Sequence, residues 1–246
     1  MDYYFITGSS QGIGRALVER ALRQENAYVY GFARSAGVER DRYTHTEVDL
    51  SRVDRLTDRL DAFFPPVNNA GRIVLINNAG TLGDIKYLGD IEDRSIITLF
   101  NLNVTAPTLL MNAFIRRYRD LAANKLIINV SSGAGKYPVD GWSGYCASKA
   151  ALDMVSQTAS LEQQIRSIDH FRIYALAPGV VNTAMQGHIR QTDTADFSKL
   201  NKFMDYHTEG ALDDPVVTAD KFFRLVNHPE QFEDVLQDVR EFPPQL

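Results

Sequence analysis

Tyr145 and Lys149 are the two residues whose types and spacing most directly suggest chemistry. They lie four residues apart in a segment with a helical pattern, so their side chains share one helical face. A free tyrosine has a pKa of about 10 and exchanges protons poorly near neutral pH. A nearby ammonium favours the phenolate, and a bound cationic cofactor would add to that effect. The pair therefore predicts a tyrosine with a lowered pKa, whereas the simpler alternative is a surface tyrosine packed on a lysine stem.

A glycine-rich turn near the N-terminus is the second feature that could bind a ligand. The apolar run from Tyr3 to Thr7 leads into this turn, and a helical pattern follows it. Glycines let the backbone approach a phosphate, and a helix N-terminus provides free N–H groups and the positive end of a dipole. A turn between the first strand and the first helix therefore predicts dinucleotide binding rather than an ordinary loop. The expected contacts here are Gly8, Ser10, Gln11, Gly12, Ile13 and Gly14.

Arg34 follows the glycine turn by about 20 residues, where dinucleotide folds carry the residue that selects the cofactor. An acid at this position binds the ribose 2′-hydroxyl, whereas a guanidinium can hold a 2′-phosphate. No Asp or Glu occurs between Phe32 and Val38, so the sequence predicts NADP(H) over NAD(H). A solvated loop arginine is the alternative. Asp49 and Leu50 end a third strand and are expected near the adenine, and Asp49 could also cap the following helix.

Alternating strand and helix patterns must position these residues. Strands are predicted at residues 3–7, 27–33, up to 49, 73–76, 125–130, 171–177 and 232–239. Helices are predicted at 12–24, 51–64 (capped by Ser51), 91–102, 106–122, 144–166 and from 215 onward. This alternation predicts an α/β fold, a Rossmann-type doubly wound parallel sheet of about seven strands with helices on both faces. Residues 1–246 are expected to form a single domain, in which a polar segment at about 184–214 covers the substrate.

Composition excludes several other classes of function. The formal net charge is −5, and no basic stripe or Lys/Arg cluster predicts binding to nucleic acid or to a lipid surface. No signal peptide or membrane-spanning run is expected. The single cysteine, Cys146, excludes an intrachain disulfide and fits a reducing compartment, so a cytoplasmic location is expected. The five histidines lack metal-ligand spacing, so no metal site is expected.

The tetrapeptide Asn-Asn-Ala-Gly occurs twice, at residues 68–71 and 77–80. The first copy precedes the fourth predicted strand, which places it at the edge of the sheet away from ligands. The second copy follows that strand, at the carboxyl edge where open α/β sheets bind ligands. Only Asn77, Ala79 and Gly80 are therefore predicted to contact the cofactor.

The motifs, taken in order, resemble those of the short-chain dehydrogenase/reductase family. They are the glycine turn, residues 77–80, Asn103, Ser131-Ser132, Tyr145 to Lys149 and Pro178-Gly179, and they cover nearly the whole chain. The resemblance implies hydride transfer between a nicotinamide and a carbonyl or alcohol. Residues 132–136, 141–142, 145–146, 178–186 and 189–192 resemble the sepiapterin reductase and benzil reductase branch. That branch is NADPH-dependent and reduces ketones and vicinal dicarbonyls.

The resemblance assigns catalytic roles to Asn103, Ser132, Tyr145 and Lys149. Tyr145 would give its proton to the carbonyl oxygen, and Lys149 would lower the phenol pKa and hold the nicotinamide ribose. Ser132 would orient the substrate oxygen, and Asn103 would hold a water relay to the lysine. Ser131 competes with Ser132, but adjacent strand-end residues point to opposite sides, so only one is expected to face the site.

Further contacts are expected around the nicotinamide and the substrate. By resemblance the cofactor contacts are Pro178, Gly179, Val181 and Thr183, together with Tyr145 and Lys149; an ordinary turn and helix cap are the alternative for the first four. Trp142, Met185 and Phe203 could cover the substrate or could be ordinary packing. Asp238 lies where sepiapterin reductases carry a substrate-anchoring Asp, and a solvated Asp is the alternative.

These observations predict NADPH-dependent reduction of a small ketone, a vicinal diketone such as benzil, or a pterin side chain. The alternatives are a 3-oxoacyl-thioester reductase and a non-catalytic dinucleotide-binding regulator, since a fold does not determine a function. The helices predicted at 106–122 and 144–166 resemble the dimer helices of the family. A homodimer is therefore expected, and a tetramer is the alternative.

Overall fold

The computed structural model describes residues 1–35, 37, 40–168 and 170–242. Seven strands form one parallel sheet in the order β3-β2-β1-β4-β5-β6-β7. The chain runs outward from β1 to β3, returns, and then runs outward from β4 to β7, which confirms the predicted doubly wound sheet. The strands are β1 (Asp2–Thr7), β2 (Ala27–Ala33), β3 (Tyr43–Glu47), β4 (Arg72–Asn77), β5 (Asn124–Val130), β6 (Phe171–Ala177) and β7 (Leu236–Asp238).

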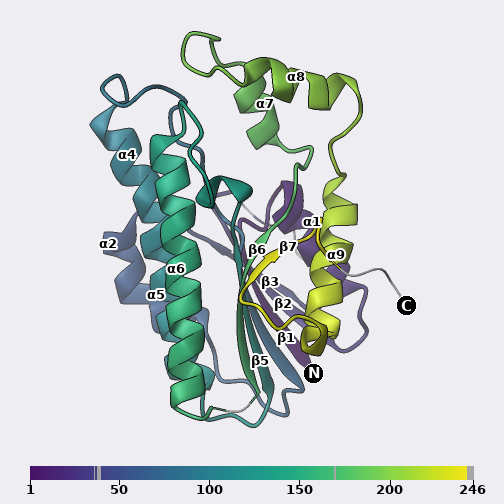
Figure 1. Cartoon of the computed structure of the whole chain (residues 1–246). Coiled ribbons are helices and arrows are strands. Elements are labelled where there is room, and N and C mark those ends of the chain that lie inside the picture. The colour runs from purple at the N-terminus through teal and green to yellow at the C-terminus, as the bar shows by residue number, and fades with distance from the viewer. Residues whose placement is uncertain (36, 38–39, 169, 243–246) are drawn as a thin grey trace.

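Helices cover both faces of the sheet, as Figure 1 shows. α4 (Asp93–Phe100), α5 (Ala106–Tyr118) and α6 (Ser143–Ile165) lie on one face, and α1 (Gly12–Leu22) and α9 (Pro215–Asn227) lie on the other. α7 (Ala184–Arg190) and α8 (Leu200–Thr208) lie beyond the carboxyl ends of the strands. The shorter helical segments are α2 (Val53–Leu56), η1 (Thr57–Arg59), α3 (Leu60–Phe63), η2 (Asn101–Thr105), η3 (Gly133–Gly135) and η4 (Pro229–Gln231).

The strand sequences explain why two layers of helices are needed. Neighbouring residues of a strand point to opposite faces, and in β1 both faces are apolar. Tyr4 and Ile6 lie in the core cluster with α1 and α9, whereas Phe5 lies in the cluster with α5. All three side chains are fully buried. The sheet is therefore central, and its carboxyl edge is left for the site.

The helix predicted at 51–64 differs from the structure. It is broken into α2, η1 and α3. The N-cap position is occupied by Arg52 rather than by Ser51, and the Arg52 side chain makes no capping hydrogen bond. Instead, the Ser51 N–H and hydroxyl donate to the Asp49 carboxylate at 3.0 and 2.7 Å. Asp49 thus closes the turn before the helix, close to the capping role considered for it.

The helices predicted at 91–102 and 106–122 form one continuous run. α4 passes into α5 through η2, a π-helical segment that contains Asn103. Single π turns inside α-helices occur often at functional sites, because the extra residue redirects one side chain. The run Asp93–Tyr118 also has the length and hydropathy of a membrane span, with 39% of its apolar window buried. A core helix meets the same criteria, and Leu110 and Phe114 pack in the core, so the run is weak evidence for a span.

The segment predicted to cover the substrate contains the two helices α7 and α8 rather than irregular loop alone. It is attached to the body by Asp140, whose carboxylate accepts from the Ser198 N–H at 2.7 Å and the Ser198 hydroxyl at 2.9 Å. The strand predicted at 232–239 is only three residues long, because irregular chain and a bend occupy residues 232–235 and a turn begins at 239. The predicted start of a helix at Pro215 is confirmed, and Asp214 caps it.

Candidate active site

Tyr145 and Lys149 lie on the buried face of α6, where their side chains are 7% and 5% exposed. The Lys149 ammonium lies 5.6 Å from the centre of the Tyr145 ring. It donates to the main-chain oxygen of Val130 at 2.7 Å, which ties α6 to the end of β5. The alternative of a surface tyrosine on a lysine stem is therefore wrong.

The expected direction of the Tyr145 pKa is also wrong. Burial raises the pKa of the Tyr145 phenol to about 12, and the Ser132 hydrogen bond opposes this only in part. Burial lowers the pKa of Lys149 to about 8, and the carboxylate of Asp153 opposes that shift. Desolvation is the largest cause of both shifts, because burial disfavours the charged form of each group. Tyr145 is consequently a protonated donor at neutral pH.

Ser132, rather than Ser131, lies with Tyr145. The Ser132 hydroxyl is close enough to the Tyr145 phenol to lower its pKa, and it also accepts from the Ala134 N–H at 3.2 Å. Ser131 points to the opposite side, where its buried hydroxyl donates to the carboxylate of Asp153. This division agrees with the alternation expected at a strand end.

Asp153 is a residue that the reasoning from sequence missed. It follows Lys149 by four residues, so Tyr145, Lys149 and Asp153 share one face of α6. Its side chain is 8% exposed, and burial raises its pKa while Ser131 and Lys149 oppose the rise. The spacing from Lys149 was the available signal, since an acid one helical turn beyond a lysine lies within its electrostatic reach.

Asn103 approaches the same site from η2 and is 1% exposed. Its amide bonds to Thr81 in both directions, accepting from the N–H at 2.9 Å and donating to the carbonyl at 2.8 Å. It also donates to the Ser148 hydroxyl at 3.1 Å. A Cβ on Gly80 would lie 3.3 Å from Asn103 Oδ1 and 3.7 Å from Lys149 Nζ, so both side chains converge on Gly80. Asn101, by contrast, bonds the Ser51 carbonyl at 3.2 Å, away from the lysine.

The glycine turn has the backbone geometry that phosphate binding requires. Gly8 and Gly12 have positive φ values of 66° and 53°, which favour glycine. A Cβ on Gly14 would lie 2.1 Å from the Gly8 oxygen, so only glycine lets the start of α1 approach the turn this closely. The Thr7 hydroxyl accepts from the N–H groups of Asn78 and Ala79 at 2.9 and 3.0 Å, which joins the turn to the end of β4. The first Asn-Asn-Ala-Gly copy lies in the loop before β4, at the other edge, as expected.

Asn77 is placed differently from the expectation. Its side chain is 4% exposed and donates to Asn129 Oδ1 at 2.8 Å, and Asn129 in turn donates to Ser156. The Asn77 amide thus belongs to a buried polar chain beneath α6, because the last residue of β4 points toward that helix. A cofactor contact of Asn77 could come only from its backbone.

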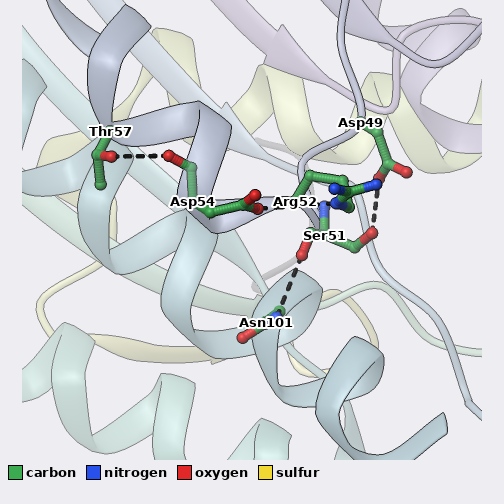
Figure 2. A network of polar contacts seen from close by, with 6 residues as sticks. All are labelled: Asp49, Ser51, Arg52, Asp54, Thr57 and Asn101. Atoms are coloured by element: carbon green, nitrogen blue, oxygen red, sulfur yellow. Dashed lines mark hydrogen bonds and ion pairs between the residues drawn. The ribbon is translucent and has the colours of Figure 1, made fainter. Parts of the chain in front are cut away.

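Arg34 and Asp49 line a pocket of about 360 Å³ at the carboxyl ends of β2 and β3. Figure 2 shows the adjacent polar network, in which Asp49 holds Ser51 and Arg52 pairs with Asp54 at 3.7 Å. The pocket is lined by four arginines, of which the sequence predicted only Arg34. The residues lining it are Arg34, Glu47, Val48, Asp49, Arg52, Arg55, Leu56 and Arg59. Leu50 is buried beside it, with 4% exposure.

The loop after β6 reaches the glycine turn. Gly179 has a positive φ of 77°, and Val181 is buried and pairs with Asp213 in an isolated bridge. A Cβ on Gly12 would lie 3.4 Å from Thr183 Cγ2, so Thr183 flanks the start of α1. The residues predicted at the pyrophosphate and the nicotinamide thus come together, although Thr183 provides no side-chain cap to α7.

An aromatic cluster covers Tyr145. Trp142 stacks on Phe197 with centroids 5.1 Å apart and an interplanar angle of 12°, and it contacts Tyr145 edge-on at 5.6 Å. Phe203 lies 5.4 Å from Trp142, and Met185 packs against the same cluster. The three predicted substrate residues therefore pack together over Tyr145, and their contact with substrate stays a prediction.

Asp238 is not solvated, so that alternative is wrong. Its side chain is 2% exposed, and both oxygens accept from the guanidinium of Arg240 at 2.9 and 2.5 Å. Burial raises its pKa, but the bonds from Arg240 bring it below its ordinary value. With both oxygens occupied by Arg240, Asp238 is a poor direct anchor for a substrate.

The class of protein is a nicotinamide-dependent oxidoreductase. It is defined by the parallel Rossmann-type sheet, the glycine turn of the phosphate-binding type, and the serine, tyrosine and lysine of the site. Comparison with known proteins is more specific. The family described as short chain dehydrogenase matches residues 3–194, and the chain belongs to this family.

Relatives and solved structures agree with this assignment. The chain is 31% identical over 245 residues to "Benzil reductase ((S)-benzoin forming)" of Bacillus subtilis, covering 98% of this chain and 100% of the relative. It is 30% identical over 240 residues to "Sepiapterin reductase" of Meriones unguiculatus, covering 90% and 89%. A solved short chain dehydrogenase/reductase of Saccharomyces cerevisiae superposes with a TM-score of 0.84 at 24% identity, covering 98% and 97% of the two chains, and shows the shared fold. The branch resemblance drawn from the motifs is confirmed.

Proposed function

We propose that this chain reduces a carbonyl group of a small ketone, a vicinal diketone or a pterin side chain, with NADPH as the hydride donor. The observation that carries the proposal is the convergence of Ser132, Tyr145 and Lys149 beneath an aromatic cover. The names of the benzil reductase and sepiapterin reductase relatives support carbonyl reduction.

The side chains divide the reaction between them. NADPH, when bound, supplies the hydride to the carbonyl carbon. Tyr145 donates its phenolic proton to the carbonyl oxygen, a step that in enzymes is typically worth about 10²–10⁴-fold. Ser132 orients that oxygen and stabilises the charge that develops on it. The Lys149 ammonium stabilises the phenolate that remains, and Asn103 holds the loop at Gly80 beside that ammonium.

The residues present fit a dinucleotide phosphate. A Cβ on Gly8 would lie 2.8 Å from Asn78 Nδ2 and a Cβ on Gly14 would lie 2.1 Å from the Gly8 oxygen, so both positions require glycine and the turn stays close to the N-terminus of α1, where N–H groups can bind a phosphate. NADPH is preferred to NADH because the pocket at Arg34 holds four arginines against the two acids Glu47 and Asp49. Arg34 and Arg55 make no ion pair with the described residues, so both guanidinium groups are available to the 2′-phosphate.

The test is NADPH oxidation with benzil, sepiapterin and a 3-oxoacyl thioester, with NADH in parallel. We expect turnover of benzil or sepiapterin, with little activity from NADH. Faster turnover of the thioester would make the chain a 3-oxoacyl-thioester reductase instead. NADPH binding without oxidation across the whole panel would make it a dinucleotide-binding regulator.

The same proposal includes a homodimer in the cytoplasm, and a tetramer is the alternative. α6 exposes Met154, Leu161 and Ile165 at 62%, 54% and 73%, and their spacing of seven and four residues places them on one face. An apolar stripe of this kind on a long surface helix is typical of helix-to-helix association between copies.

A further inference from the structure

Arg240 lies just beyond β7 and is held there by Asp238. The Arg240 N–H and Nε donate to Asp238 Oδ1 at 3.0 and 2.9 Å, and Nη2 donates to Oδ2 at 2.5 Å. The carboxylate is 2% exposed, whereas the arginine side chain is 57% exposed. The buried Asp238 carboxylate accepts through both oxygens and so fixes the orientation of the planar, permanently charged guanidinium of Arg240.

The guanidinium lies beside the proton-transfer residues. A Cβ placed on Gly133 would lie 3.8 Å from Arg240 Nη2 and 3.3 Å from the Tyr137 hydroxyl. Gly133 directly follows Ser132, whose hydroxyl acts on the pKa of Tyr145. On the other side, a Cβ on Gly179 would lie 3.8 Å from Arg240 Cγ. Arg240 therefore spans the two loops that follow β5 and β6, next to the expected position of the substrate carbonyl.

One side of the Arg240 guanidinium, at Nη1, makes no hydrogen bond to the described residues. Nε and Nη2 are engaged by Asp238, and Nη1 has no acceptor among the residues that the structure describes. Lys136 is close enough to act electrostatically on Asp238, and the exposed Glu241 partly offsets that positive charge. Arg240 therefore offers the site a directed hydrogen-bond donor, at Nη1, rather than a strong net positive charge.

We propose that Arg240 is a specificity residue that donates a hydrogen bond to the second oxygen of a vicinal dicarbonyl, while Ser132 and Tyr145 hold the first. This rests on the proposed carbonyl reduction. A vicinal dicarbonyl places an acceptor oxygen on the carbon next to the reacting carbon, whereas a simple ketone has none there. A site built around a donor discriminates against a ligand that leaves the donor unpaired. An amino-bearing group would meet a guanidinium here instead of the carboxylate expected from Asp238.

The test compares 1-phenyl-1,2-propanedione with 1-phenyl-1-propanone, which differ only in the second carbonyl. We expect Arg240→Ala to lower kcat/KM for the dione by about 10–100-fold and to leave the monoketone within about 2-fold. Arg240→Lys should recover only part of the loss, since an ammonium lacks the fork. Asp238→Asn should lower the preference for the dione although Arg240 is still present, because it removes the carboxylate that orients the Arg240 guanidinium.

Arg23→Ala is the matched control, because Arg23 is an exposed arginine at the end of α1. It should change neither substrate, and NADPH affinity should be unchanged in every variant. An unchanged dione-to-monoketone ratio in Arg240→Ala would overturn the inference and leave the proposed function standing. A wild-type protein that reduces neither substrate nor any other carbonyl would overturn both.

Discussion

The Lys149 ammonium donates a hydrogen bond to the main-chain oxygen of Val130 at 2.7 Å, at the point where β5 ends. The bond holds the charge beneath Tyr145, but burial lowers the lysine pKa to about 8. The charge that the proposed mechanism needs is therefore close to being lost at slightly alkaline pH. Asp153, the next acid on the same face of α6, opposes that loss.

We expect kcat/KM for carbonyl reduction to fall as pH rises through about 8, because Lys149 then loses its proton. Asp153→Asn removes a charge that raises the Lys149 pKa, so the fall should move to lower pH. The measurement is the pH–rate profile of the wild type and of Asp153→Asn. Asp220→Asn, an exposed acid paired with Arg20 on the far face, should leave the profile in place. An identical profile for Asp153→Asn would show that Asp153 does not act on Lys149.

Tyr145→Phe should lower kcat by about 10²–10⁴-fold, because the ring stays but the proton donor is removed. NADPH affinity, measured by fluorescence titration, should change little. Tyr28→Phe is the control, since Tyr28 lies near the amino end of β2 and its exposed hydroxyl is hydrogen-bonded to Thr44 at 2.8 Å. Loss of activity in both variants alike would contradict the assignment of Tyr145 as the donor.

Arg34→Ala and Arg55→Ala should each weaken NADPH binding by roughly 10-fold or more, because each removes a charged donor to the 2′-phosphate. NADH, which lacks that phosphate, should bind the variants and the wild type equally. The dissociation constants of both cofactors are the measurement. Arg116→Ala, whose guanidinium pairs with Asp61 elsewhere on the surface, should affect neither. Equal losses for both cofactors would remove the basis for NADPH preference.

Asp140→Ala should loosen the segment that carries α7 and α8, because Asp140 holds Ser198 by two hydrogen bonds. We expect faster proteolysis within residues 184–214 and a higher KM for the carbonyl substrate. The free energy of unfolding should fall by only about 1 kcal/mol, the usual net value of such bonds. A proteolysis rate equal to that of the wild type would mean that the aromatic stack of Trp142 and Phe197 alone holds the segment.

Leu161→Glu should convert a dimer into a monomer, since it places a charge in the exposed apolar stripe of α6. Light scattering after size-exclusion chromatography measures the mass directly. Glu162→Gln, at a neighbouring exposed position on the other side of the stripe, should leave the mass unchanged. A wild-type monomer would rule out both the dimer and the tetramer.

Most of the fold could be predicted from the sequence. The strands at 27–33 and 171–177 match the structure residue for residue. Buried parallel strands are continuous apolar runs, and a glycine turn marks the first crossover, so local patterns are sufficient. The helix at 51–64 failed, because neither Ser51 nor Arg52 caps it and the chain tightens into a 3₁₀ turn at Thr57.

The site was predictable where it depended on spacing along one element. Tyr145 and Lys149 share a face of α6 because helical geometry makes residues four apart neighbours. The same rule could have found Asp153. Arg52, Arg55 and Arg59 could not have been found in this way, because they reach Arg34 only when α2 and η1 dock beside the ends of β2 and β3.

The sequence by itself determined the alternation of strands and helices, the glycine turn and the pairing of Tyr145 with Lys149, since all three follow from local spacing. Only the tertiary structure decided that Ser131 bonds Asp153, that Asp238 is occupied by Arg240, and that the Tyr145 pKa rises. These outcomes depend on burial and on contacts between segments far apart in the chain. Desolvation and orientation are properties of the folded surroundings, and spacing within one element does not contain them.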